Sequence, residues 1–245
     1  MERKIMKVNI LETGSAGNCV LATFSDGRRI IFDFGTGAWK LCCEADVDFH
    51  EIDNVLVTHD HADHSADYGR IRFLAFPRLC KVLEFPVLHS VPNKGYIVLN
   101  EHTKEGFIYA TDYHTLPEES LAKIKAMVGF KDWKWFCMLE LSYCRWLYNK
   151  LDKFQLIGLN QHCSDERFFK YSHDILEVNP AVNILSLHAS ARQATYVEGG
   201  NKVGEVCPID WVRDQMYQRF KGAHVHVGEA GRKLERTFYF MDINE

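Results

Sequence analysis

The stretch from Asn54 to Ser65 reads Asn-Val-Leu-Val-Thr-His-Asp-His-Ala-Asp-His-Ser. Its apolar start, 55–57, predicts a short buried strand. Three histidines and two aspartates follow within six residues, from His59 to His64. In an extended segment alternate side chains share a face, so His59 and His61 point the same way. Such side chains are costly to bury unpaired and are natural metal ligands, so this stretch predicts a metal site at the end of a strand.

Length and composition are those of an ordinary soluble globular protein. The chain has 245 residues, 47% hydrophobic and 25% charged, which is enough for one large domain or two small ones. No repeat or low-complexity linker marks a second domain. The formal net charge of −4 excludes a general polycation that would bind nucleic acid or anionic membranes. A local basic groove remains possible.

Targeting signals are missing from the sequence pattern. Residues 1–7 lack the apolar core of a signal peptide, and no apolar run approaches the roughly 20 residues that span a bilayer. The eight cysteines are scattered, without a Cys-x-x-Cys pair, which favours reduced thiols over a disulfide framework. We therefore expect a cytoplasmic protein without a membrane partner.

Further polar residues follow other predicted strands. Asp33 ends an apolar run, His89 ends another, and Asp112 and His188 end two more. A glycine-rich turn at 13–19, Thr-Gly-Ser-Ala-Gly-Asn-Cys, exposes backbone amides that suit an anion or a close approach to a metal site. A plain hairpin turn explains that segment equally well.

These motifs, in this order, resemble the metallo-β-lactamase superfamily from about Lys7 to Arg192. The resemblance implies one α/β domain over 1–245, a four-layer αββα sandwich. It also implies two divalent metal ions. Imidazole and carboxylate ligands suit zinc, with manganese or iron as alternatives. The implied ligands are His59, His61, Asp63, His64, His89, Asp112 and His188. Asp112 would bridge the two ions. Asp33 would not bind metal but would support the loop that carries His59 to His64, called the metal loop below.

The same resemblance implies a hydrolytic reaction. A metal-bridging hydroxide would be the nucleophile, since the ions lower the pKa of water, and Asp63 would orient it. His162 and His114 are candidate proton donors to the leaving group. The His-x-Ser-x-Arg form at 188–192 resembles the ribonuclease Z type, in which Arg192 would contact a phosphate oxygen; an exposed loop arginine is the alternative.

Substrate class is open, because the fold supports many reactions. Our first hypothesis is a phosphodiesterase acting on nucleic acid or on a nucleotide such as a cyclic nucleotide, with a nuclease favoured. The second is a hydrolase of a thioester, lactone or amide. The third is a non-catalytic, metal-stabilised binding protein, although such a module has no need of seven ligands.

The segment 115–153 departs from this pattern and is predicted to be a helical insertion. Pro117 and the acids after it suit a first helical turn, and a second helix is expected from Phe136 to Leu151. Six large aromatic residues lie between Trp133 and Tyr148. We expect this segment to contact a second subunit, making a homodimer, or to form one wall of the substrate cleft.

Overall fold

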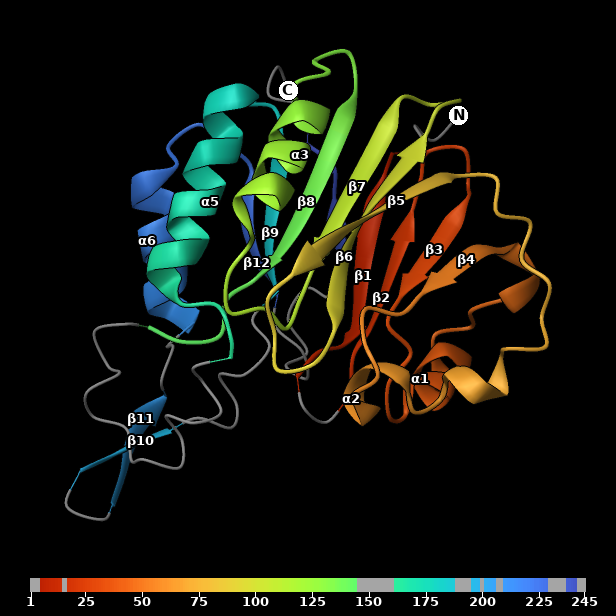
Figure 1. The fold of residues 1–245 in the computed structure, drawn as a ribbon, viewed down its shortest axis with the longest axis horizontal. Helices are drawn as coiled ribbons and strands as arrows, with labels where there is room; N and C mark the ends of the chain where they lie inside the picture. The colour runs from red at the N-terminus through yellow and green to blue at the C-terminus, as the bar shows by residue number, and fades with distance from the viewer. Residues whose placement is uncertain are drawn as a thin grey trace.

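Two β-sheets face each other in this structure, which is a computed structural model (Figure 1). The structure describes residues 5–14, 17–144, 161–187, 195–198, 201–205, 209–228 and 237–241.

The first sheet has five strands in the order β13-β1-β2-β3-β4. Its strands are β1 (Lys7–Glu12), β2 (Cys19–Thr23), β3 (Arg29–Phe32), β4 (Ile52–Leu56) and β13 (Thr237–Tyr239). The pairs are antiparallel except for β3 and β4, which run parallel. A parallel pair needs a crossover, and here α1 (Ala38–Glu44) and the 3-10 turn η1 (Phe49–Glu51) supply it.

The second sheet has six strands in the order β12-β9-β8-β7-β6-β5. These are β5 (Lys81–Val87), β6 (Asn93–Asn100), β7 (Glu105–Ala110), β8 (Lys134–Glu140), β9 (Asn183–Leu187) and β12 (Val225–Gly228). The strands β7, β8, β9 and β12 are parallel, so their carboxyl ends meet at one edge of the sheet. Such an edge is where α/β proteins commonly bind ligands.

Three hydrophobic cores separate four layers. One core lies between the sheets and includes Phe32, Tyr109 and Phe136. A second packs α3 (Glu118–Val128), α5 (Asp165–Val178) and α6 (Ile209–Arg219) against the second sheet. The third packs α1 against the first sheet. The expected αββα sandwich is therefore confirmed.

Shorter elements complete the described chain. The metal-loop helix α2 (Ala62–Ser65) and the 3-10 turn η2 (Tyr68–Arg70) follow β4, and β10 (Thr195–Glu198) pairs with β11 (Asn201–Glu205). No helix within the described ranges is both long and apolar enough to cross a membrane.

The segment after Asp112 corrects one prediction. Helix α3 begins at Glu118 behind Pro117, as its acidic first turn predicts. The second helix expected from Phe136 to Leu151 is wrong over 136–144, because Lys134–Glu140 forms β8 in the middle of the second sheet, while 145–151 lie outside the described residues. The apolar run 135–139 is buried on both faces by the flanking layers, and short apolar runs of this kind fit a buried strand as well as a helix.

That strand also explains several of the aromatic residues. Trp135, Phe136 and Tyr143 are at most 1% exposed within the chain itself, so they provide no surface for a second subunit. Trp146 and Tyr148 lie outside the described residues.

Candidate metal centre

The loop that follows β4 carries the first histidines into the interior. His59 is 4% exposed and leads into α2, which places Asp63 and His64 one helical turn further on. The turn is held by backbone bonds, with the His64 N–H donating to the His61 carbonyl at 2.9 Å and the Phe34 N–H donating to the His64 carbonyl at 2.8 Å. The loop is thus fixed to the end of β3.

Asp33 anchors this loop from below. It is fully buried and adopts a left-handed backbone with φ of 57°. Its carboxylate accepts bonds from the Thr58 N–H at 2.9 Å and the Thr58 hydroxyl at 2.8 Å. It also accepts bonds from the Tyr109 hydroxyl and from His64 Nδ1, each at 2.9 Å. Asp33 therefore supports the loop that carries the predicted ligands, as the resemblance implies.

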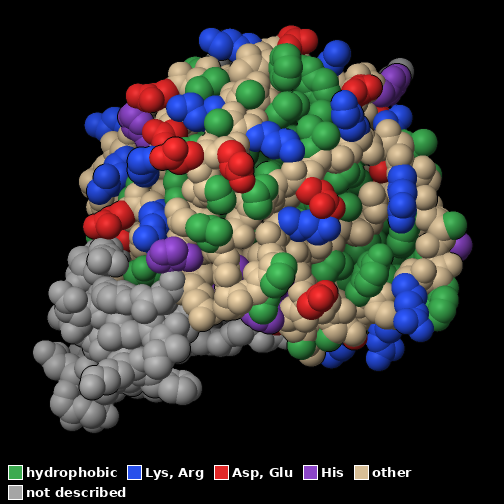
Figure 2. Space-filling model, viewed as in Figure 1, with side chains coloured by type: hydrophobic (Ala, Val, Ile, Leu, Met, Phe, Trp, Pro, Cys, Tyr) green, Lys and Arg blue, Asp and Glu red, His purple; other side chains and the backbone are tan. Residues whose placement is uncertain are grey.

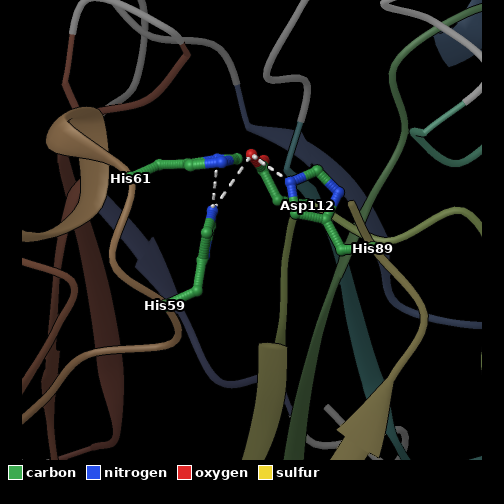
Figure 3. Close-up of side chains that lie close together, drawn as sticks. All are labelled: His59, His61, His89 and Asp112. Carbon is green, nitrogen blue, oxygen red and sulfur yellow. Dashed lines mark hydrogen bonds and ion pairs between the residues drawn. The ribbon is translucent and has the colours of Figure 1, made fainter. Parts of the chain in front are cut away.

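A first cluster joins His59, His61, His89 and Asp112, with one ligand atom of each lying within 4.8 Å of the others (Figure 3). His59 Nε2 is 3.0 Å from His61 Nδ1 and 3.8 Å from Asp112 Oδ2. His89 Nε2 approaches the same Asp112 oxygen at 3.9 Å. Side chains from three separate segments therefore converge on one point.

A second cluster shares Asp112 with the first and adds Asp63 and His64. His64 Nε2 lies 3.3 Å from Asp112 Oδ2 and 3.5 Å from Asp63 Oδ2. Asp112 sits where β7 ends, in a left-handed conformation with φ of 49°. The structure thus brings together six of the seven predicted ligands. His188 and Arg192 lie outside the described residues.

The histidines are held in the tautomer that a metal requires. His64 Nδ1 donates to the Asp33 carboxylate, and His89 Nδ1 donates to the Gln161 carbonyl at 3.2 Å. His59 Nδ1 lies 3.0 Å from the Thr58 hydroxyl oxygen, whose own proton goes to Asp33. Each bond occupies Nδ1 and leaves Nε2 as the ring nitrogen that faces the cluster, which is the usual arrangement around metal-binding histidines.

The buried atoms of the cluster also fit a metal ion. His89 Nε2 is buried and has no hydrogen-bond partner among the described residues. An unpartnered buried nitrogen is costly unless something binds it. Nitrogen and oxygen atoms of this kind, at least three to a cluster, suit zinc or a similar divalent ion. The donor set therefore fits the metal that the sequence predicts.

Electrostatics separate the ligands into neutral and charged groups. Burial lowers the pKa of His59 to about 4, with the charge of His64 adding to the effect. Burial likewise lowers the pKa of His89. Burial opposes ionisation of Asp112 too, but the charge of His64 outweighs it and holds the pKa of that carboxyl well below its usual range. Neutral imidazoles beside an ionised carboxylate favour a bound cation.

His64 carries the opposite shift. Burial lowers its pKa, but the carboxylates of Asp33 and Asp112 overcome burial and raise the pKa well above the ordinary value. For Asp63, burial is again outweighed, here by the hydrogen bond and charge of His64, which lower its pKa. The same concentration of negative charge that holds a proton on His64 attracts a metal ion in its place.

Glu140 is a member of the site that the sequence analysis missed. It ends β8, is fully buried, and accepts bonds from the Tyr113 N–H at 2.8 Å and from the Ser142 hydroxyl. It also lies 2.8 Å from His162 Nδ1, and that nitrogen is 3.9 Å from Asp112 Oδ1. Burial of His162 is outweighed by Glu140, which raises the pKa of His162 to about 9. The missed signal was an acid that ends a strand, as Asp112 does.

The two proton-donor candidates now differ. The His162 ring centre is 5.6 Å from that of His89, so His162 stands beside the ligands. His114 instead lies with Nδ1 at 3.1 Å from Arg167 Nη1, and it belongs to none of the metal-type clusters found among the described residues. The geometry favours His162.

Comparison with known proteins identifies a relative by sequence. The chain is 36% identical over 185 residues to the anti-Pycsar protein Apyc1 of Bacillus phage BSP38, a match that covers 69% of each chain. No family model matches the sequence.

Solved structures show the same fold. The metallo-β-lactamase fold protein YhfI from Bacillus subtilis superimposes with a TM-score of 0.63 and 13% identity, covering 95% of this chain and 99% of that one. A diphosphatase of the PhnP family gives 0.61 and 13%, covering 97% and 98%. The short form of human tRNase Z gives 0.61 and 12%, covering 96% and 100%. These likenesses confirm the metallo-β-lactamase fold.

Proposed function

We propose that this chain, a metal-dependent hydrolase that belongs to the family of the anti-Pycsar protein Apyc1, is a phosphodiesterase that opens a cyclic nucleotide. The observation that carries the proposal is the pair of ligand clusters that share Asp112. Two ions held this closely suit phosphodiester hydrolysis, in which charge develops on both the attacking and the leaving oxygen.

The first ion would be held by His59, His61 and His89, and the second by Asp63, His64 and His188, with Asp112 between them. Zinc fits the donor set best, and manganese or iron are the alternatives. When bound, the ions supply Lewis acidity and make hydroxide available near neutral pH.

Asp63 has two roles in this proposal. Its side chain is 20% exposed, whereas that of His64 is fully buried, so the carboxylate lies between the buried ligands and solvent. From that position it binds metal and also aligns the attacking water. Alignment of a reacting group is worth several powers of ten in rate.

His162 is the proposed proton donor to the leaving oxygen. Its Nδ1 is bound to Glu140, so the proton available for transfer is the one on Nε2. Glu140 keeps the imidazolium oriented and favours its charged form. Overall, water adds across one P–O bond and yields a phosphomonoester and a free hydroxyl. Arg192, if it reaches the site, would pair with a phosphate oxygen.

Charge favours a small nucleotide over a polynucleotide. Nucleic-acid binding relies on many Lys and Arg contacts to phosphates, and this chain has 29 basic against 33 acidic residues. A cyclic nucleotide carries a single phosphodiester, which a compact site can neutralise alone. The family relative, an anti-Pycsar protein, agrees with a signalling nucleotide better than with a structural RNA. A nuclease is the second candidate, favoured by the likeness to tRNase Z.

A substrate panel tests the proposal. The zinc-loaded protein is assayed against cyclic nucleotides with purine and pyrimidine bases, single-stranded RNA and DNA, bis-p-nitrophenyl phosphate, and a set of thioesters and lactones. We expect turnover of cyclic nucleotides to nucleoside monophosphates. Faster cleavage of the polynucleotides would favour the nuclease function over the proposed one. Turnover of thioesters or lactones alone would refute both functions. A homodimer remains a prediction, which light scattering would decide.

A further inference from the structure

Asn18 is a buried polar residue, 2% exposed, at the end of the glycine-rich turn. Its side-chain oxygen accepts a bond from the Gly14 N–H at 3.0 Å, and its amide nitrogen donates to the Gly14 carbonyl at 3.1 Å. These two bonds close the turn and fix the direction of the amide group. One amide N–H is thus used within the turn, which leaves the second N–H for the metal loop.

Asn18 contacts two members of the second cluster, Asp63 and His64, which lie on the metal loop. Its backbone N–H donates to the Asp63 carbonyl at 2.7 Å, and its side-chain amide reaches the same carbonyl at 3.2 Å. That amide nitrogen is also 3.4 Å from Asp63 Oδ2 and 3.0 Å from His64 Nε2. Because His64 Nδ1 is bound to Asp33, Nε2 is the nitrogen left for an ion. An ion there would take the lone pair that the Asn18 N–H faces, and that N–H would then be left for Asp63.

A turn-closing role alone would need only the bonds to Gly14. The contacts beyond them reach Asp63 and His64, and among the described residues the Asn18 side chain makes no hydrogen bond to His59, His61 or His89. An amide N–H cannot itself bind a cation, so its effect on an ion must pass through Asp63, the ligand that it still contacts when an ion is bound to His64.

We propose that Asn18 is a positioning residue for the second metal ion, holding the Asp63 carboxylate in place beside the His64 ring. The inference rests on the two-ion centre of the proposed function. Loss of the amide leaves the Asp63 side chain free to rotate and weakens that site alone. Outer groups that orient metal ligands typically change metal affinity by about 10–100-fold.

The experiment compares metal binding in two variants and one control. Asn18→Ala removes the amide, and Asn18→Leu removes it while keeping nearly the same volume. Asn179→Ala is the matched control, because Asn179 is also buried and also clamps backbone, donating to the Val128 carbonyl at 2.8 Å and accepting from the Ala181 N–H at 3.1 Å. Each protein is stripped with a chelator, checked for folding by circular dichroism, and titrated with Zn²⁺ by calorimetry and with Co²⁺ by absorption.

We expect two ions in the wild type and in Asn179→Ala. In both Asn18 variants we expect the first ion to bind normally and the second about 10–100-fold more weakly. Two ions bound with wild-type affinity in either folded Asn18 variant would overturn the inference, as would equal weakening of both ions in Asn18→Leu. A wild type that binds a single ion would instead contradict the two-ion centre of the proposed function, so the two failures are distinguishable.

Discussion

Asp33 Oδ2 and His64 Nδ1 lie 2.9 Å apart, and both side chains are fully buried. This pair joins the end of β3 to His64, a ligand of the second cluster. Four donor groups bind the Asp33 carboxylate, so its removal would leave four buried donors without this acceptor.

Asp33→Ala should therefore lower the unfolding free energy of the metal-free protein and weaken zinc binding. Each buried donor left unsatisfied costs about 1–3 kcal/mol, so we expect a loss of several kcal/mol in unfolding free energy by urea titration. Asp53→Ala is the control, since Asp53 accepts bonds from the Leu79 and Cys80 N–H groups away from the ligands. The control should lose stability yet keep zinc; a loss of zinc there would show that instability alone empties the site.

Asp63→Ala should abolish turnover with little change in the fold, because its side chain is partly exposed and its backbone bonds remain. We expect a loss of at least about 100-fold in kcat, since a ligand and the group that aligns the nucleophile are both removed. Initial rates are compared at equal metal content. Asp60→Ala, at an exposed neighbouring position, should be near wild type. Equal rates for the two variants would remove Asp63 from the mechanism.

Stability of the metal-free protein should fall with alkaline pH through His162. Its pKa is raised from 6.5 to about 9 in the fold. The stabilisation that this raised pKa gives to the folded state is fully present below about pH 6.5. It is lost as pH rises through about 9, which lowers the free energy of unfolding by roughly 3 kcal/mol. Glu140→Gln removes the carboxylate that raises the pKa, so its unfolding free energy should change less over this interval. Parallel curves for the two proteins would show that Glu140 does not control His162.

Gly35→Ala should disrupt the metal loop by contact with backbone. A Cβ at Gly35 would lie 1.7 Å from the Asp63 carbonyl oxygen, so the backbone at Gly35 or at Asp63 would have to move. We expect a lower melting temperature and reduced zinc content by elemental analysis. Gly69→Ala is the control, because a Cβ there meets nothing within 4 Å. Full zinc content in Gly35→Ala would mean that the loop tolerates displacement.

Residues that end strands were predictable, because a polar group after an apolar run has few structural explanations. That rule found His59, His89 and Asp112, and the order of the motifs supplied the fold. It failed at Glu140, because the apolar run before it was expected to be helical, so the end of a strand was not recognised there. Asn18 was visible only as part of a turn. Its contact with the metal loop depends on how the turn packs across β3, which no local pattern encodes.

The hydrogen bonds around Asp33 also separate folding from metal choice. The loop that carries Asp63 and His64 is tied to the sheets by protein groups alone, and the three hydrophobic cores lie outside it. Folding can then be complete before any ion arrives, unlike in small domains whose structure forms only with metal. The ion would then enter a site that is already formed, and its identity would be set by the donor atoms together with the supply of metal.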